Sequence, residues 1–433
     1  MTVEAGFPAA DRRGPTLTGW RRVAALGAGN ALEWFDWGVY SAMLPFFATY
    51  VFGGAGADSL LAGLAVFAAG YIARPLGGLV FGMIADRRGR TIALALTIAC
   101  VAGGCLGVAF LPGHEQVGHL AGVLLLALRV VQGFGQGGEL PSLQVYIAEN
   151  APPRHLGRWS SLIYTSGNAG VIGGMTLGAA MATLLPPDDL RSWGWRVPFL
   201  LGGLLGLAAV GLRAYLREPA AAEPARPLPL RDHLRALVAH RRALLAISAL
   251  VAGSTVAIYA WGNSASAFAI TFGGMSRSEA LWAAVAAYAT GAVLIPLWGE
   301  VADRVGHRRV MLAGAIVVAV GSLPVSRALS GGPVNLYLCM AAMLIPIGAI
   351  LSVEPVYIAR LVPPGSRTTA IGVTYSIVAA VLGGTAPYLR AWFHVHLGDD
   401  AFAVYVTALA VLSVIALVLV RPPEEPSRRD AAS

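Results

Sequence analysis

The segment GMIADRRGR at residues 82–90 recurs 217 residues further along the chain as GEVADRVGHRR at residues 299–309. A second pair of segments, VYIAENAPP from Val145 and VYIARLVPP from Val356, repeats at a similar interval of 211 residues. Both intervals are close to half of the 433-residue chain. A repeat on this scale predicts two structurally similar halves that arose by duplication.

Long apolar stretches fill most of both halves. The chain is 56% hydrophobic and only 12% charged, whereas a soluble domain carries about 25% charged residues. One bilayer crossing needs ~20 mainly apolar residues. The sequence therefore predicts an all-α membrane protein whose twelve transmembrane helices occupy residues 23–52, 60–84, 91–112, 119–148, 159–185, 195–216, 243–271, 279–302, 309–329, 334–360, 368–397 and 400–420.

The distribution of basic residues predicts the orientation. All 31 are arginines, and 24 of them fall in segments that would share one side of the membrane with the N-terminus. The positive-inside rule therefore predicts cytoplasmic termini, and the net charge of +8 needs no nucleic-acid partner. The first apolar run is too long for a cleavable signal peptide. The predicted order is a tail (1–22), a six-helix half (23–216), a cytoplasmic linker (217–242), a second six-helix half (243–420) and a tail (421–433).

Each predicted half crosses the membrane six times, an even number, so the two copies share one orientation. This parallel-repeat arrangement is typical of transporters whose substrate site lies between the halves near the membrane midplane. The sequence lacks the motifs that define several classes of enzyme. The chain has no lysine for a P-loop, and neither HExxH nor GxSxG occurs. We therefore expect a transporter, not an enzyme, with no cofactor and no metal.

Longer segments narrow the class further. The G-x-x-x-D-R-x-G-R pattern at residues 82–90 resembles the signature loop of the major facilitator superfamily. With it come GNALEWFDWGVYS (29–41), RPLGGLVFGMIADRRGR (74–90), RVVQGFGQGGE (129–139) and WGWRVPF (193–199). Together they resemble the metabolite:proton symporters of that superfamily, most of all the α-ketoglutarate permeases and the related proline/betaine carriers, over residues ~20–420. The resemblance implies transport driven by the proton gradient.

Ionisable residues inside the predicted helices are candidates for function, because a charge in a membrane helix costs several kcal/mol. Glu33 and Asp36 are three residues apart and Tyr40 extends the same helix face. Glu33, Arg74 and Glu139 each lie about ten residues from a predicted cytoplasmic helix end, which places all three ~15 Å deep. We interpret this group as a proton and substrate site with one arginine; the alternative is a static ion pair.

Three further residues have two interpretations each. Arg129 could bind a substrate carboxylate through its two-donor fork, or could pair with an acid on the first helix. Arg74 and Arg129 are expected to be the only arginines well inside the helices. The resemblance marks Arg196 as of interest, although an interfacial anchor beside tryptophans explains it equally well. Glu354 departs from the family pattern and could serve the substrate or a second proton.

The two signature loops predict a gate on the cytoplasmic side. Their aspartates could accept hydrogen bonds from the N-terminus of a neighbouring helix, and their glycines permit a tight turn. The alternative is a static cap. The residues concerned are Gly82, Asp86, Arg87, Gly89 and Arg90 in the first copy, and Gly299, Asp303, Arg304 and Gly306 in the second.

The sequence thus predicts a monomeric, multi-pass protein of the bacterial inner membrane whose partners are the bilayer, a small-molecule substrate and the proton. The favoured function is proton-coupled uptake of a small organic acid by rocking of the two halves. Thr49 and Ala380 depart from the α-ketoglutarate permease pattern, so a symporter of a zwitterionic osmolyte such as proline or betaine is the alternative. Proton-driven efflux is less favoured because Gly170 is followed by Val171, not proline.

Overall fold

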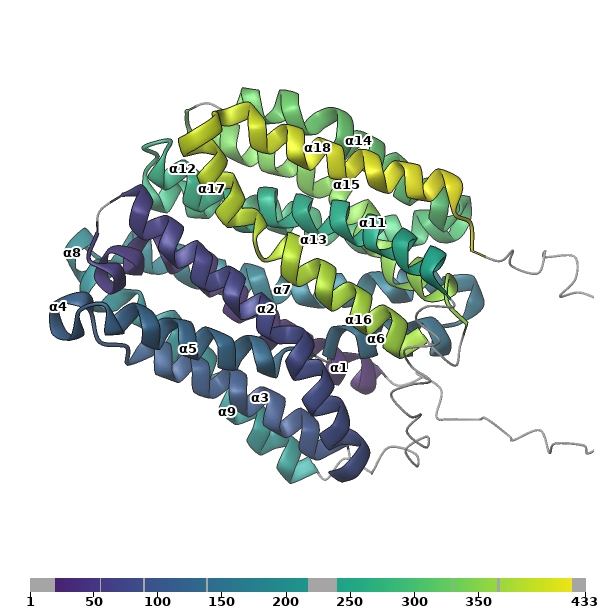
Figure 1. Cartoon of the computed structure of the whole chain (residues 1–433), viewed down its shortest axis with the longest axis horizontal. Coiled ribbons are helices and arrows are strands. Elements are labelled where there is room, and N and C mark those ends of the chain that lie inside the picture. Colours follow the sequence, from purple (N-terminus) through teal and green to yellow (C-terminus); the bar gives the residue numbers. More distant parts are fainter. Residues whose placement is uncertain are drawn as a thin grey trace, which may run out of the picture.

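The computed structural model describes residues 20–422 except 55, 89, 138, 217–239, 330 and 364–366, and the described residues form helices and connecting loops without strands (Figure 1). The first half contains α1 (Trp20–Phe52), α2 (Ala57–Arg88), α3 (Arg90–Ala109), α4 (His114–Val117), α5 (Leu120–Gly135), α6 (Glu139–Asn150), η1 (Pro153–His155), α7 (Leu156–Leu184), α8 (Pro187–Asp189), η2 (Leu190–Gly194) and α9 (Arg196–Leu216).

The second half repeats this plan. It contains α11 (Arg241–Ile258), η3 (Tyr259–Asn263), α12 (Ala265–Thr271), α13 (Arg277–Val305), α14 (His307–Ala328), α15 (Pro333–Arg360), α16 (Arg367–Val378), η5 (Ala379–Gly383), α17 (Ala386–Leu397) and α18 (Asp399–Leu419). In Figure 1 α3, α5 and α9 of the first half lie in the lower part of the bundle, and α14, α15 and α18 of the second half lie in the upper part.

Every predicted membrane stretch is helical. Within the described residues, eight spans are long and apolar enough to cross a bilayer, and two shorter helical segments (Ala95–Ala109 and Leu120–Gly135) are also apolar. The helices α1 and α7, of 33 and 29 residues, are also long enough to cross. The predicted all-α fold of twelve crossings is therefore confirmed.

Three stretches that the sequence predicts as single helices are interrupted. Residues 119–148 divide into α5 and α6 at a glycine-rich segment, while 243–271 and 368–397 each contain a wide π-helical turn, η3 and η5. The two π turns occupy similar positions in the first and fifth crossings of the second half. Hydrophobic length does not reveal such interruptions, because they do not shorten the apolar run.

The halves meet along α7 with α13 and α15, α1 with α12, and α2 with α16 and α17. We call the end of the bundle where α1 and α11 begin and α18 ends the terminal face, and the opposite end the distal face. Tyr71 of α2 and Tyr259 of η3 bond through their hydroxyls across the boundary between the halves.

Within the first half, α2 and α5 pack backbone against backbone. A Cβ placed at Gly133 would lie 1.8 Å from the carbonyl oxygen of Gly70, and one at Gly77 would lie 1.8 Å from that of Phe134. Only glycine fits at these crossings, and their close approach brings Arg74 of α2 and Arg129 of α5 to the same side of α1.

We expect Gly133→Ala to lower the free energy of unfolding by about 1–3 kcal/mol, because the added methyl overpacks a backbone contact that cannot yield. Gly103→Ala is the matched control, since nothing lies within 4 Å of a Cβ there. That helical substitution should be neutral or stabilising by up to about 1 kcal/mol. Denaturant unfolding of both variants in detergent tests the expectation, and equal stability would show that α2 and α5 can separate without cost.

Candidate functional site

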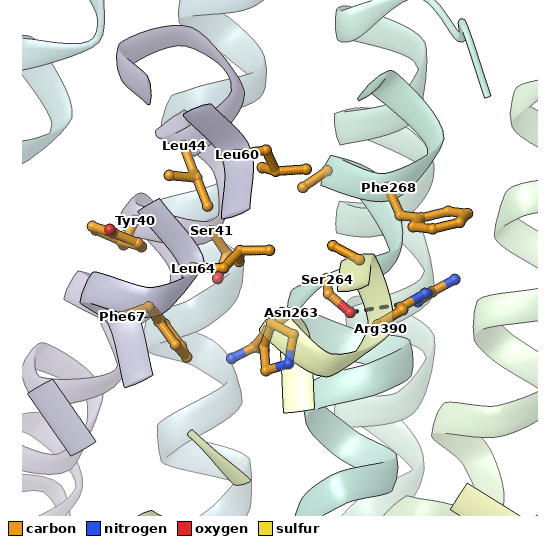
Figure 2. Close-up of a pocket in the computed structure, with 13 residues that line it drawn as sticks. Tyr40, Ser41, Leu44, Leu60, Leu64, Phe67, Asn263, Ser264, Phe268 and Arg390 are labelled. Carbon is orange, nitrogen blue, oxygen red and sulfur yellow. Dashed lines mark hydrogen bonds between the residues drawn. The ribbon is translucent and has the colours of Figure 1, made fainter. Parts of the chain in front are cut away.

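A cavity lies between the two halves, towards the distal face, and contains about 390 Å³ of space free of protein atoms, part of it open to the outside. Figure 2 shows its two walls facing each other. α1 and α2 contribute Tyr40, Ser41, Leu44, Leu60, Leu64 and Phe67, and the second half contributes Asn263, Ser264, Ala267, Phe268, Pro387, Arg390 and Ala391. The lining is mainly apolar with a few polar groups, as is typical of small-molecule sites.

Arg390 is the charged residue among those that line this cavity, and sequence reasoning missed it. Its side chain is 7% exposed and reaches past Ser264 to lie 4.6 Å from the centre of the Phe268 ring. Nη1 donates to the carbonyl of Ala260 and, at 3.4 Å, to Ser264 Oγ. Among the described residues, no carboxylate lies within ion-pair distance of it.

The expectation that Arg74 and Arg129 are the only arginines well inside the helices is therefore wrong. Sequence reasoning grouped Arg390 with arginines in or near helices and outer loops, although it lies inside the predicted stretch 368–397. The helix α17 ends at Leu397, as predicted, and this places Arg390 more than one turn from the helix end. An arginine seven residues before the last helical residue was the signal that could have revealed it.

Asp36 and Arg129 form a sealed ion pair behind the first-half wall of the cavity. Arg129 Nη1 donates to Asp36 Oδ2 at 2.7 Å, and the two side chains are 1% and 2% exposed. Gln132 Nε2 at 3.1 Å and the Cys105 thiol at 3.2 Å also donate to Asp36 Oδ1. The structure thus shows the pairing with a first-helix acid that the sequence left as one of two options for Arg129.

Tyr40 stands between this ion pair and the cavity. Its ring lies 4.0 Å from the guanidinium carbon of Arg129, a cation–π distance, while the same side chain lines the cavity. Its hydroxyl donates to the carbonyl of Gly63 on α2 at 2.7 Å. A movement of Tyr40 would therefore change both its contact with the Asp36–Arg129 ion pair and its hydrogen bond to α2.

Glu33 has a different arginine. Arg74 Nη2 lies 3.4 Å from Glu33 Oε1 and donates to Gln136 Oε1 at 2.8 Å. The Arg74 guanidinium also lies over the rings of Tyr71, at 4.1 Å, and Trp37, at 4.6 Å. The expected cluster with one arginine is thus two acid–arginine pairs in the structure. The i,i+3 spacing keeps both carboxylates on one face of α1, where Glu33 meets Arg74 of α2 and Asp36 meets Arg129 of α5.

Several predicted residues lie outside the part of the chain whose side chains are described. Glu139 begins α6, but its side chain is not among them, so its role stays a prediction. The same holds for the first signature loop: the side-chain surroundings of Gly82, Asp86, Arg87 and Arg90, and all of Gly89, fall outside the described residues.

Arg196 does not reach the cavity lining. Its Nη2 donates to the Tyr50 hydroxyl at 3.0 Å and to the carbonyl of Leu111 at 2.9 Å, while Nη1 donates to the carbonyl of Ser192. Its guanidinium also lies 4.3 Å from the Trp195 ring. These contacts join the distal ends of α1, α3 and α9, which favours the interpretation of Arg196 as an anchor.

The aspartate of the second signature loop accepts hydrogen bonds from the N-terminus of a neighbouring helix, and this helix belongs to the first half. Asp303 Oδ1 accepts a hydrogen bond from the backbone of Gly157 at 2.7 Å, and Oδ2 accepts one from Arg158 at 3.0 Å, at the N-terminus of α7. His307 Nε2 lies 3.1 Å from the same carboxylate. We call the contact between Asp303 and Gly157–Arg158 the latch; its gating role stays a prediction.

The remaining residues of that loop support the latch. A Cβ at Gly299 would lie 2.5 Å from the carbonyl oxygen of Gly157, so α7 and α13 approach backbone to backbone. Gly306 has a φ of +106°, which ends α13 in a conformation that favours glycine. Arg304 pairs with Glu300 on the exposed side of α13.

Glu354 lies apart from the acid–arginine pairs, on α15 of the second half, and it is fully buried. Neither of its carboxylate oxygens has a hydrogen-bond partner among the described residues.

The sequence model of the Major Facilitator Superfamily matches residues 26–274 and 250–433. The α-ketoglutarate permease of Escherichia coli (strain K12) is 33% identical, over 93% of this chain and 94% of that protein. A putative proline/betaine transporter of Staphylococcus aureus (strain MSSA476) is 30% identical, over 92% and 87%. In structure, the xylose transporter XylE from E. coli in a partially occluded inward-open conformation is similar, with a TM-score of 0.71, 16% identity, and coverage of 91% and 95%.

Proposed function

This chain belongs to the Major Facilitator Superfamily, and we propose that it is a proton-coupled symporter that takes up a small organic acid by alternating access. The observation that carries this proposal is the composition of the cavity between the halves. Its second-half wall holds a buried arginine without a carboxylate partner among the described residues, and its first-half wall backs onto buried acid–arginine pairs.

The substrate would supply the missing negative charge. A buried guanidinium costs free energy unless it is paired, and its planar fork matches a carboxylate with two parallel hydrogen bonds. Arg390 uses Nη1 for contacts within the protein, and no bond from Nε or Nη2 joins it to another described residue. The 33% identity to an α-ketoglutarate permease supports an organic acid as the substrate.

Proton coupling would use the carboxylates of the first half. The Asp36 carboxylate could either bind a proton or, when ionised, pair with Arg129. Binding of a proton would therefore release Arg129 from the ion pair. Because Tyr40 touches Arg129 and lines the cavity, binding of substrate and proton would then be linked through one side chain. Glu33 with Arg74 is the second candidate pair.

Alternating access would proceed by opening the latch at the terminal face while the distal cavity closes. The excess of arginines in the segments of the terminal face favours its placement in the cytoplasm. We accordingly propose a monomer in the bacterial inner membrane with both termini inside, driven by the proton gradient and needing no cofactor.

The alternative substrate is a zwitterionic osmolyte, which the 30% identity to a putative proline/betaine transporter supports. The rings of Tyr40, Phe67 and Phe268 in the cavity could hold a quaternary ammonium group by cation–π contacts. An organic acid and a zwitterionic osmolyte both have a carboxylate that could bind Arg390. Only the osmolyte also has a cationic group, so contacts to that group would distinguish the two substrates.

We expect Arg390→Lys to raise the KM for uptake of labelled α-ketoglutarate into proteoliposomes at least about tenfold, or 1.4 kcal/mol, since lysine keeps the charge but loses the fork. Arg327→Lys is the matched control, because Arg327 is exposed and paired with Asp400 at the distal face. An unchanged KM in Arg390→Lys would remove Arg390 from the site. Uptake of betaine without uptake of dicarboxylates by the wild type would replace the organic-acid proposal with the osmolyte one.

A further inference from the structure

Glu354 is the most isolated acid in the described part of the chain. Its residue is 0% exposed, and both carboxylate oxygens are enclosed by protein without a hydrogen-bond partner among the described residues. An ionised carboxylate in such a place would cost several kcal/mol. The enclosed form of the protein is therefore compatible with a neutral, protonated Glu354.

Among the described residues, none that is found to act on the Glu354 carboxylate carries a positive charge. Its electrostatic neighbours are Tyr164 of α7 and Tyr375 of α16, and Ser254 of α11 is also close. The Ser254 hydroxyl, however, donates to backbone carbonyls of its own helix. None of these three groups carries a charge at neutral pH.

Other helices packed against α15 bring no counter-ion within ion-pair distance, as far as the described residues show. α6 presents the buried amide of Gln144. η3 contributes Tyr259, which with Arg74 of α2 interacts electrostatically with Tyr375. The charged groups of α13 and α14 in this region, Glu300, Asp303, Arg304, His307, Arg308 and Arg309, lie at the terminal ends of those helices.

Glu354 lies where the latch seals the boundary between the halves. It is six residues before the end of α15, and Tyr164 is eight residues after the start of α7, so both lie ~10 Å from the terminal face. Further polar groups of α6 and α7 are enclosed without partners among the described residues, namely Gln144, Ser160 Oγ and Tyr164 Oη. Opening of the latch at Gly157 would hydrate this group as a whole.

We propose that Glu354 is a proton-binding site of the second half that must be protonated for the terminal face to close, and that it releases its proton to water when the latch opens. This inference rests on the proposed symport and assigns the site of proton release in it. The proton passes from the carboxyl group to water of the opened terminal cavity, which leaves a hydrated carboxylate. Reprotonation then permits closure again. High pH therefore favours the open terminal face, and low pH favours the closed one.

The test reports on the conformation and needs no substrate. Ser160→Cys places a thiol at the enclosed boundary, and a membrane-impermeant maleimide is applied to the terminal side; the three native cysteines are free, so labelling of the parent chain is subtracted. Because only the thiolate reacts and its fraction also rises with pH, each labelling rate is divided by that of the denatured reporter at the same pH. With Glu354 intact, this corrected rate should rise by up to about tenfold per pH unit until the open state dominates. Glu354→Gln, which mimics the neutral acid, should label slowly at every pH.

Two control variants test whether the pH dependence comes from the carboxyl group of Glu354 or from His307 in the latch. Glu354→Asp should retain the pH dependence, and so should His307→Gln, which removes the titratable partner of Asp303 in the latch. Glu354→Gln should fold as stably as the wild type, because a neutral side chain already occupies the site. Labelling of Glu354→Gln that rises with pH as in the wild type, or loss of folding in that variant, would overturn the proposal. A wild type that takes up no organic acid would instead refute the proposed function while leaving this test intact.

Discussion

Asp36→Asn is expected to abolish proton-driven uptake and to destabilise the protein by about 3–5 kcal/mol, since it leaves the buried charge of Arg129 without a partner. Arg129→Gln should cost less. The guanidinium cannot give up its proton, whereas the carboxyl group of Asp36 can take one and become neutral. The two single variants should therefore differ in their loss of stability, although each removes one partner of the same 2.7 Å contact.

The double variant Asp36→Asn with Arg129→Gln should be more stable than Asp36→Asn alone, because no unpaired charge remains. It should still lack accumulation of substrate against a gradient, although exchange of substrate across the membrane stays measurable. Unfolding in detergent gives the stability terms, and uptake with and without an imposed pH gradient gives the coupling. Asp36→Asn with normal gradient-driven uptake would leave the ion pair a purely structural role.

The fold was predictable from the sequence because it depends on lengths and repeats. Twelve apolar stretches specify the helices, and two signature loops half a chain apart specify their division into halves. The structure has helices in all twelve stretches. The π turns η3 and η5 were not predictable in this way, because they leave the hydrophobic pattern of their stretches unchanged.

The sequence predicted which charged residues form the site better than it predicted which of them pair with each other. The apolar context identified Glu33, Asp36, Arg74 and Arg129, but helix spacing does not say which neighbouring helix each carboxylate meets. The amide partners were detectable in principle. Gln132 and Gln136 lie three and seven residues after Arg129, on one face of α5 and its C-cap, and they bond to Asp36 and Arg74 respectively.

The latch supports a second prediction of large effect. Asp303 accepts two backbone N–H groups at the start of α7, where the helix dipole adds to the attraction of a negative charge. Hydrogen bonds to a charged group contribute about 1.5–3 kcal/mol each. Loss of even one such contribution would shift the balance towards an open terminal face about tenfold or more.

We therefore expect Asp303→Ala to raise maleimide labelling of the Ser160→Cys reporter about tenfold or more at a fixed pH. Glu300→Gln is the control: it removes a carboxylate one turn earlier on α13 that pairs with exposed Arg304 and does not cross to the other half. Gly299 and Gly157 still permit the close backbone contact of α7 and α13 in both variants. Equal labelling of Asp303→Ala and Glu300→Gln would mean that backbone packing, and not the aspartate, holds the terminal face closed.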